Sequence, residues 1–157
     1  MALNKDCYDR PYIIGRITAY IEAYENTPVG FAGKVSTNPQ DQSFSYHLRN
    51  ALKKAVDESD SGFLELANMM GDLRDYHDSA GKFWLGYYHQ KADFDRDKIG
   101  SAIQKKRIEL GWTQTDLADR CGLSYSTISK IESGRWSASV DILSKIGSAL
   151  GLSLKFE

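Results

Sequence analysis

The sequence predicts an all-α protein in two parts, an N-terminal helical bundle over residues 1–95 and a smaller helical domain over residues 98–157. Apolar residues recur at helical spacing in most segments, and glycine, proline and small polar residues separate those segments. Apolar and polar residues alternate near the C-terminus, at Leu152, Leu154 and Phe156, which suggests one short strand after the helices.

The composition is that of a folded protein, and it argues against several classes. Of the 157 residues, 41% are hydrophobic and 26% are charged, as is typical of a globular domain. No apolar run reaches the roughly 18 residues of a membrane span, and the N-terminus lacks the apolar core of a signal peptide. We expect a cytoplasmic protein with reduced thiols, because Cys7 and Cys121 cannot form a disulfide framework.

Charge is unevenly divided along the chain, although the formal net charge is only −1. Residues 1–97 hold 11 Lys or Arg against 15 Asp or Glu, whereas residues 98–157 hold 9 against 6. Attraction to phosphate therefore belongs to the C-terminal part. The N-terminal part lacks a broad basic surface, so we expect its partners to be proteins.

Three amphipathic helices are expected in the first 76 residues. The apolar spacing predicts them over residues 12–24, 44–56 and 63–76. Residues 26–43 contain two of the three prolines and are expected to form a long loop. The polar side of the second helix carries three basic residues, which form either a basic patch or a solvated face with ordinary helix pairing: Arg49, Lys53 and Lys54.

A fourth helix, over residues 81–94, is rich in aromatic side chains. It contains five of them around Gly86, so we expect it to form the centre of the bundle or its interface with another chain. The polar run Asp95–Asp97 is expected to form a hinge or a cap before the C-terminal domain.

Two short helices joined by a tight turn are predicted within residues 113–134. Thr113, with Asp116 three residues later, has the spacing of a capping box, and Gly122 favours the left-handed conformation that ends a helix. Ser124 then caps a second helix whose isoleucines point inward. The opposite face of that helix carries small polar residues and one lysine, which suits the groove of a duplex.

Residues 99–152 resemble the lambda-repressor-like (Cro/CI, XRE) helix-turn-helix family. The resemblance rests on the residues around the two caps and on the Ile-Glu-x-Gly ending: Gln114, Leu117, Ala118, Gly122, Ser124, Ile131, Glu132 and Gly134. It implies a five-helix domain whose second motif helix lies in the major groove of double-stranded operator DNA. The alternative is a domain of this fold that serves protein contacts only.

The same resemblance implies roles for individual residues. Four side chains would read base edges, namely Tyr125, Ser126, Thr127 and Ser129. Three would hold phosphates, namely Gln114, Lys130 and Arg135. Arg107 would form a structural ion pair with Glu132 instead of contacting the DNA.

The N-terminal half resembles a second family through two motifs, YIIGRITAYIE at residues 12–22 and FWLGYYHQK at residues 83–91. Over residues 8–94 the chain is similar to the C-terminal helical region of the large subunit of type I-C CRISPR interference complexes, a bundle akin to the small subunits that help to hold displaced DNA. The shared positions are Gly15, Arg16, Ala19, Glu22, Phe83, Gly86, Tyr87, Tyr88, His89 and Gln90. The resemblance implies a protein interface formed by Arg16, Trp84, Tyr87, Tyr88, His89 and Gln90. An unrelated oligomerisation bundle is the alternative.

These observations favour a sequence-specific DNA-binding protein of bacterial or mobile-element origin, associated with the nucleoid. The leading hypothesis is an anti-CRISPR protein that mimics a subunit of the type I-C complex and represses its own promoter. A plain transcriptional regulator or antitoxin, whose bundle dimerises or senses a ligand, remains an alternative. So does a genuine small-subunit-like component of the complex.

A lone C-terminal strand would lack a partner in an all-helical chain, so we expect two copies to pair there as a homodimer. No enzymatic activity, cofactor or metal is expected. His47, His77 and His89 are scattered, and the sequence has no metal-ligand spacing and no nucleophile in a recognisable setting.

Overall fold

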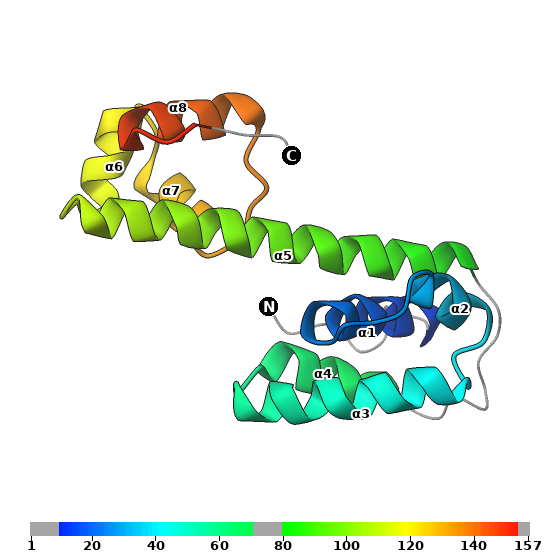
Figure 1. Cartoon of the computed structure of the whole chain (residues 1–157). Helices are drawn as coiled ribbons and strands as arrows, with labels where there is room; N and C mark the ends of the chain where they lie inside the picture. Colours follow the sequence, from blue (N-terminus) through cyan, green and yellow to red (C-terminus); the bar gives the residue numbers. More distant parts are fainter. Residues whose placement is uncertain (1–9, 71–79, 154–157) are drawn as a thin grey trace. The chain divides into compact units, whose positions relative to one another are not determined.

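The only regular secondary structure in the residues that the structure describes is α-helix. The computed structural model describes residues 10–70 and 80–153, and no strand occurs in them. Their helices are α1 (Arg10–Tyr24), α2 (Phe31–Thr37), α3 (Gln42–Asp57), α4 (Ser61–Met70), α5 (Ala80–Glu109), α6 (Gln114–Cys121), α7 (Tyr125–Glu132) and α8 (Val140–Leu150) (Figure 1). The predicted all-α class is confirmed. Leu154 and Phe156 of the suggested strand lie outside the described residues, and so do residues 71–76 of the expected third helix.

The chain divides into two compact units, residues 1–91 (unit 1) and residues 92–157 (unit 2). Helices α1 to α4 and the first part of α5 belong to unit 1, and the remainder of α5 with α6 to α8 belongs to unit 2. The run Asp95–Asp97, expected as a hinge or a cap, lies inside α5. A short polar run is compatible with a solvent-exposed helix face as well as with an interruption between two helices. Both aspartates are exposed on α5.

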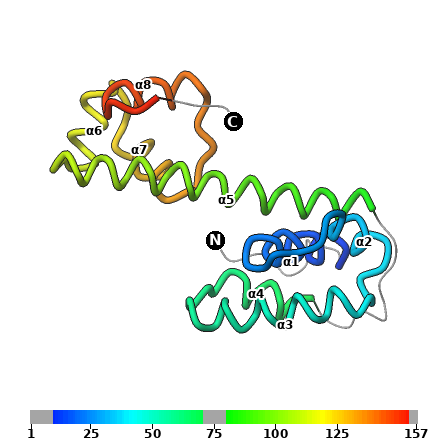
Figure 2. Tube along the Cα trace, in the orientation of Figure 1, coloured from blue at the N-terminus to red at the C-terminus, as the bar shows by residue number. Residues whose placement is uncertain are grey.

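Helix α1 supplies the centre of the core of unit 1. Its Ile14, Ile17 and Ile21 are fully buried, and α3 and α4 pack against it. The tube view shows α3 and α4 following one another through a short turn (Figure 2). Two tyrosines of α1 stack on Phe63 of α4, the nearer being Tyr20 at 4.7 Å between ring centroids. Burial of this apolar surface is the main stabilising term for a bundle of this size.

Two glycines allow α1 and the first part of α5 to cross at backbone distance. A Cβ atom added to Gly15 would overlap the carbonyl oxygen of Phe83, and one added to Gly86 would overlap the carbonyl oxygen of Tyr12. Gly15 lies in the first N-terminal sequence motif, residues 12–22, and Gly86 lies in the second, residues 83–91. The crossing of the two helices therefore brings the two motifs into contact.

The expected loop over residues 26–43 contains a helix, α2, which the sequence pattern did not predict. Its Phe31 and Val35 are 2% and 1% exposed and form part of the core of unit 1. The sequence around this segment is rich in prolines and glycines, which predict a loop. The helix forms because Phe31 and Val35 pack into the core of unit 1.

Unit 2 packs its helices around a second apolar core, formed by Ile103, Leu117, Ala118, Cys121, Ile128, Ile131, Ile146 and Leu150. Within residues 92–153 there are four helical segments where five were expected. The link between α7 and α8, residues 133–139, contains turns and no helix. Gly100 brings α5 close to the end of α7, because a Cβ atom there would overlap the carbonyl oxygen of Ile131.

Candidate nucleic-acid interface

Helix α6 begins at the expected capping box. The Thr113 hydroxyl accepts a hydrogen bond from the Asp116 amide at 3.1 Å, and Asp116 Oδ2 accepts from the Thr113 amide at 2.8 Å. The Thr113 hydroxyl also donates to Asp116 Oδ2 at 2.7 Å. The hydrogen bonds that the Asp116 carboxylate accepts from the Thr113 hydroxyl and amide hold its pKa below the ordinary value. The helix ends at Gly122, whose φ of 63° is left-handed.

Helix α7 is oriented by a local cap and by its buried isoleucines. Ser124 Oγ accepts from the Thr127 amide at 3.1 Å, which satisfies one of the free donors at the helix start. Ile128 and Ile131 are 0% and 3% exposed, so one face of α7 is fixed against the core of unit 2. The opposite face is thereby directed toward solvent.

The four predicted base-reading residues are not equally accessible. Tyr125 is 56% exposed and Ser126 is exposed as well. Thr127 and Ser129 are half-buried, and the Thr127 hydroxyl lies 2.9 Å from Ser124 Oγ in a local hydrogen bond. The first turn of α7 therefore offers Tyr125 and Ser126 most freely.

Two of the three predicted phosphate ligands are exposed. Lys130 and Arg135 reach solvent at the end of α7 and just after it. Gln114 is half-buried instead, and its Nε2 donates a 2.8 Å hydrogen bond to Glu132 Oε2. The amide group of Gln114 is therefore held by unit 2 itself.

Arg107 and Glu132 form a buried, two-pronged ion pair. Arg107 Nε donates to Glu132 Oε1 at 2.6 Å, and Nη2 donates to Oε2 at 2.9 Å. The remaining nitrogen of Arg107, Nη1, donates to the carbonyl oxygen of Trp112 at 2.7 Å. The hydrogen bonds to Glu132 raise the pKa of Arg107 above its ordinary value. The guanidinium is thus engaged on every side and joins α5, the turn before α6, and α7.

A second arginine of the motif, Arg120, contacts an aromatic ring that no sequence pattern connects with it. Arg120 of α6 lies over the ring of Trp112, with its guanidinium carbon 4.1 Å from the ring centroid. Their separation of eight residues across a helix start left no pattern that would have revealed this cation–π contact.

The predicted protein-interface residues of unit 1 are partly used inside the chain. Gln90 is 2% exposed and accepts a 2.8 Å hydrogen bond from Arg16 Nε. The Tyr87 hydroxyl donates to Glu22 Oε2 at 2.5 Å, and burial together with this carboxylate raises the pKa of Tyr87. Gln90 is therefore a buried helix–helix contact between α1 and α5 and cannot form part of a surface.

Three of the six interface residues remain available at the surface of unit 1. Tyr88 is 63% exposed and stacks on the half-buried Trp84, with ring centroids 5.9 Å apart. His89 is exposed, and its Nδ1 lies 2.9 Å from the Tyr12 hydroxyl.

No group of three or more His, Cys, Asp or Glu residues that could hold a metal occurs in residues 10–70 and 80–153. In the same ranges, none of the helices has the length and apolar character needed to cross a membrane.

Comparison with known proteins agrees with the geometry of unit 2. The helix-turn-helix family model matches residues 103–156. An uncharacterized HTH-type transcriptional regulator of Methanothermobacter thermautotrophicus is 45% identical over 49 residues, which are 31% of this chain and 71% of that protein. The ImmF control region 10 kDa protein of Bacillus phage phi105 is 38% identical over 60 residues, 38% of this chain and 67% of that protein.

A hypothetical transcription factor of Neisseria meningitidis is 37% identical over 46 residues, 29% of this chain, and the match spans only 43% of that protein. No solved structure matches the chain. None of these findings supports the resemblance of the N-terminal half to the type I-C large subunit. The match to the family model and the two relatives covered over two thirds of their length show that this chain belongs to the helix-turn-helix family of DNA-binding transcriptional regulators.

Proposed function

We propose that this protein is a sequence-specific repressor that inserts α7 into the major groove of an operator, including that of its own promoter. The observation that carries the proposal is the two-sided character of α7. Ile128 and Ile131 fix one face against the core, while Tyr125, Ser126 and Lys130 stand exposed on the other. A helix held in this way can present polar groups to base edges with little loss of side-chain freedom.

Phosphate contacts would set the register of α7 on the duplex. Residues 98–157 carry an excess of basic residues, and Lys130 and Arg135 lie exposed beside the recognition face. A primary amide has two N–H donors, so Gln114 can bond Glu132 with one and a phosphate oxygen with the other. In this proposal Gln114 keeps its phosphate role, and Glu132 orients it.

The direct test is selection of binding sites from random duplex DNA by the full chain, followed by affinity measurements on the selected site. We expect one consensus that binds about 10³-fold or more tightly than unrelated DNA at physiological salt. Equal affinity for all duplexes, or no binding, would refute sequence-specific repression. A consensus found upstream of the protein's own coding sequence would support autorepression.

Two copies acting together would read a pseudo-palindromic operator. In that arrangement the half-sites lie one helical turn apart, about 34–36 Å, or a multiple of it. A selected consensus with inverted half-sites at such a spacing supports a homodimer on DNA, and a single asymmetric site contradicts it.

A second candidate function, inhibition of a type I-C CRISPR complex by subunit mimicry, is favoured by one observation. The two motifs that resemble the large subunit meet through Gly15, Gly86 and the Arg16–Gln90 hydrogen bond, while Trp84 and Tyr88 stay at the surface. An aromatic pair of this kind is a common anchor in protein interfaces.

Co-purification of the full chain with a type I-C complex would test the mimicry, with Trp84→Ala/Tyr88→Ala as the variant. Mimicry requires binding that the variant loses, together with weaker binding of target DNA by the complex. Binding that instead strengthens the grip on DNA would favour a genuine subunit. No binding leaves a plain regulator or an antitoxin.

A further inference from the structure

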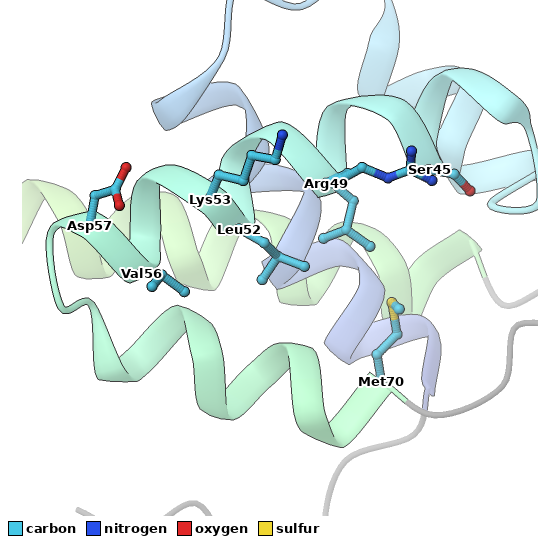
Figure 3. A pocket seen from close by; sticks show the side chains of 8 residues that line it. Ser45, Arg49, Leu52, Lys53, Val56, Asp57 and Met70 are labelled. Carbon is cyan, nitrogen blue, oxygen red and sulfur yellow. The ribbon is translucent and has the colours of Figure 1, made fainter.

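An apolar groove with charged rims runs along α3 in unit 1 (Figure 3). Its volume is about 740 Å³, and its floor is formed by Leu48, Leu52 and Val56 of α3 with Met70 of α4. Val56 is 59% exposed, which is high for an apolar side chain that lines a groove.

The side chains that line the groove from α3 form two parallel rows, because residues four positions apart lie on the same side of a helix. Leu48, Leu52 and Val56 form the apolar row, which extends for about 12 Å along the helix axis. Arg49, Lys53 and Asp57 form the charged row beside it, and the close-up shows Lys53 and Asp57 on the rim above Leu52 and Val56. Among the residues that the structure describes, none of these three charges has an ion-pair partner.

The neighbouring lysine shows the contrast. Lys54 donates to Glu25 at 2.7 Å and to the carbonyl oxygen of Tyr24 at 2.6 Å, so it serves the packing of α3 on α1. Of the three basic residues on the polar side of α3, Arg49 and Lys53 thus remain for an external contact.

We propose that the groove is a self-association surface, in which α3 of one copy packs antiparallel against α3 of a second copy. A two-fold axis through such a contact brings each row against the same row of the partner. With Leu52 opposite the partner's Val56, the partner's Asp57 lies level with Ala51. That position is between Arg49 and Lys53, so one carboxylate can reach both cations, and the symmetry repeats the contact.

The order of charges favours a second copy over an unrelated acidic helix. An acidic helix would match Arg49 and Lys53 but would oppose Asp57 of the same rim. A second copy places its Asp57 beside Arg49 and Lys53, and its Arg49 and Lys53 beside Asp57. It also packs its own apolar row against the apolar row of the first copy. The inference concerns unit 1 and does not depend on the DNA-binding proposal.

Charge-inverted partners provide the test, with the mass of the full chain measured by light scattering and sedimentation without DNA. One variant, Arg49→Asp/Lys53→Asp, makes the charged row wholly negative, and the other, Asp57→Lys, makes it wholly positive. We expect the unaltered protein to dimerise at micromolar concentration and each variant alone to associate at least about tenfold more weakly, because like charges then face one another. An equimolar mixture of the two variants should restore the dimer as a heterodimer, which a loss of folding could not do.

Two matched substitutions of valine by aspartate test whether the apolar floor of the groove takes part in the contact. Val56→Asp should weaken association, whereas Val29→Asp should not, since Val29 is fully exposed and lies outside the groove. Circular dichroism checks that all variants stay helical.

Several results would overturn the inference. One is a monomer at 100-fold higher concentration, as expected if residues 71–79 of the same chain or a different protein occupies the groove. Another is a dimer that resists both charge variants and is lost on Leu152→Asp, which would place the contact at the C-terminus. A monomer that still binds its operator would remove this inference and leave the repressor proposal intact.

Discussion

Arg107 and Glu132 lie against each other so that two guanidinium nitrogens meet both carboxylate oxygens, with side chains only 10% and 2% exposed. Glu132 Oε2 also accepts from Gln114, so one carboxylate joins α5, α6 and the last turn of α7. The orientation of α7 therefore depends on a buried polar network as well as on apolar packing.

Removing one partner of this network should be costly. Glu132→Ala leaves the Arg107 guanidinium buried beside no carboxylate, and we expect a loss of about 3–5 kcal/mol in the stability of unit 2. Hydrogen exchange of the amides of unit 2 measures this without assuming one unfolding transition for both units. The control is Glu109→Gln at an exposed site, with an expected change within about 0.5 kcal/mol. Equal protection in both variants would show that the pair is not structural.

Enlarging a glycine at the α1–α5 crossing should destabilise unit 1. In Gly86→Ala the new methyl group overlaps the carbonyl oxygen of Tyr12, and we expect a loss of about 1–3 kcal/mol or more. Gly81→Ala, in the same helix with open space around it, should instead stabilise by up to about 1 kcal/mol. Chemical denaturation followed by tryptophan fluorescence compares the two, in a background in which Trp112 and Trp136 of unit 2 are replaced by Phe so that Trp84 reports on unit 1. Similar shifts in both variants would contradict the close crossing.

The capping box predicts a pH dependence of stability. The pKa of Asp116 is lower in the folded state than its ordinary value, so its stabilising contribution is present above about pH 4 and is lost as the pH falls through the folded pKa. Asp116→Asn lacks this titration. We expect a lower melting temperature than the unaltered protein at pH 7, and a difference that shrinks below about pH 4. Asp119→Asn, at an exposed position of the same helix, should show neither effect.

Substitutions on the exposed face of α7 should separate phosphate contacts from base contacts. Lys130→Ala is expected to weaken binding to all duplexes about equally and to reduce the salt slope of affinity by about 1. Ser126→Ala should relax the preference at one base step, with a cost of about 1–3 kcal/mol on the selected site. Fluorescence anisotropy at several salt concentrations distinguishes them, with Lys34→Ala in unit 1 as the control. Identical profiles for the two variants would argue against α7 as the reading helix.

The helix-turn-helix segment could be located from the sequence because its signals are local. Each cap is formed by residues within about one helical turn of one another. The structure has the capping box at Thr113 and Asp116, the left-handed residue at Gly122 and the serine cap at Ser124. The periodicity of the isoleucines in α1 predicted a buried face for the same reason.

The availability of each predicted site residue could not be read from the sequence. Gln114 is bonded to Glu132, which is 18 residues away, and Gln90 is bonded to Arg16, which is 74 residues away. No local pattern records such a pairing. Helix α2 likewise depends on a pocket for Phe31 that other helices form, and Asp95–Asp97 has the same polar composition in a helix as in a hinge.

The amino-acid sequence by itself determined where the helices of the DNA-binding motif begin and end, and which of their faces are apolar. Helix caps and the periodicity of apolar residues depend on neighbours within a few positions along the chain, so they can be predicted from the sequence. Only the tertiary structure decided which polar groups are free to meet a partner, such as Ser126 and Tyr88, and which are held by hydrogen bonds within the fold, such as Gln90 and Gln114. Burial and hydrogen bonding of those groups depend on helices that meet only after the chain has folded.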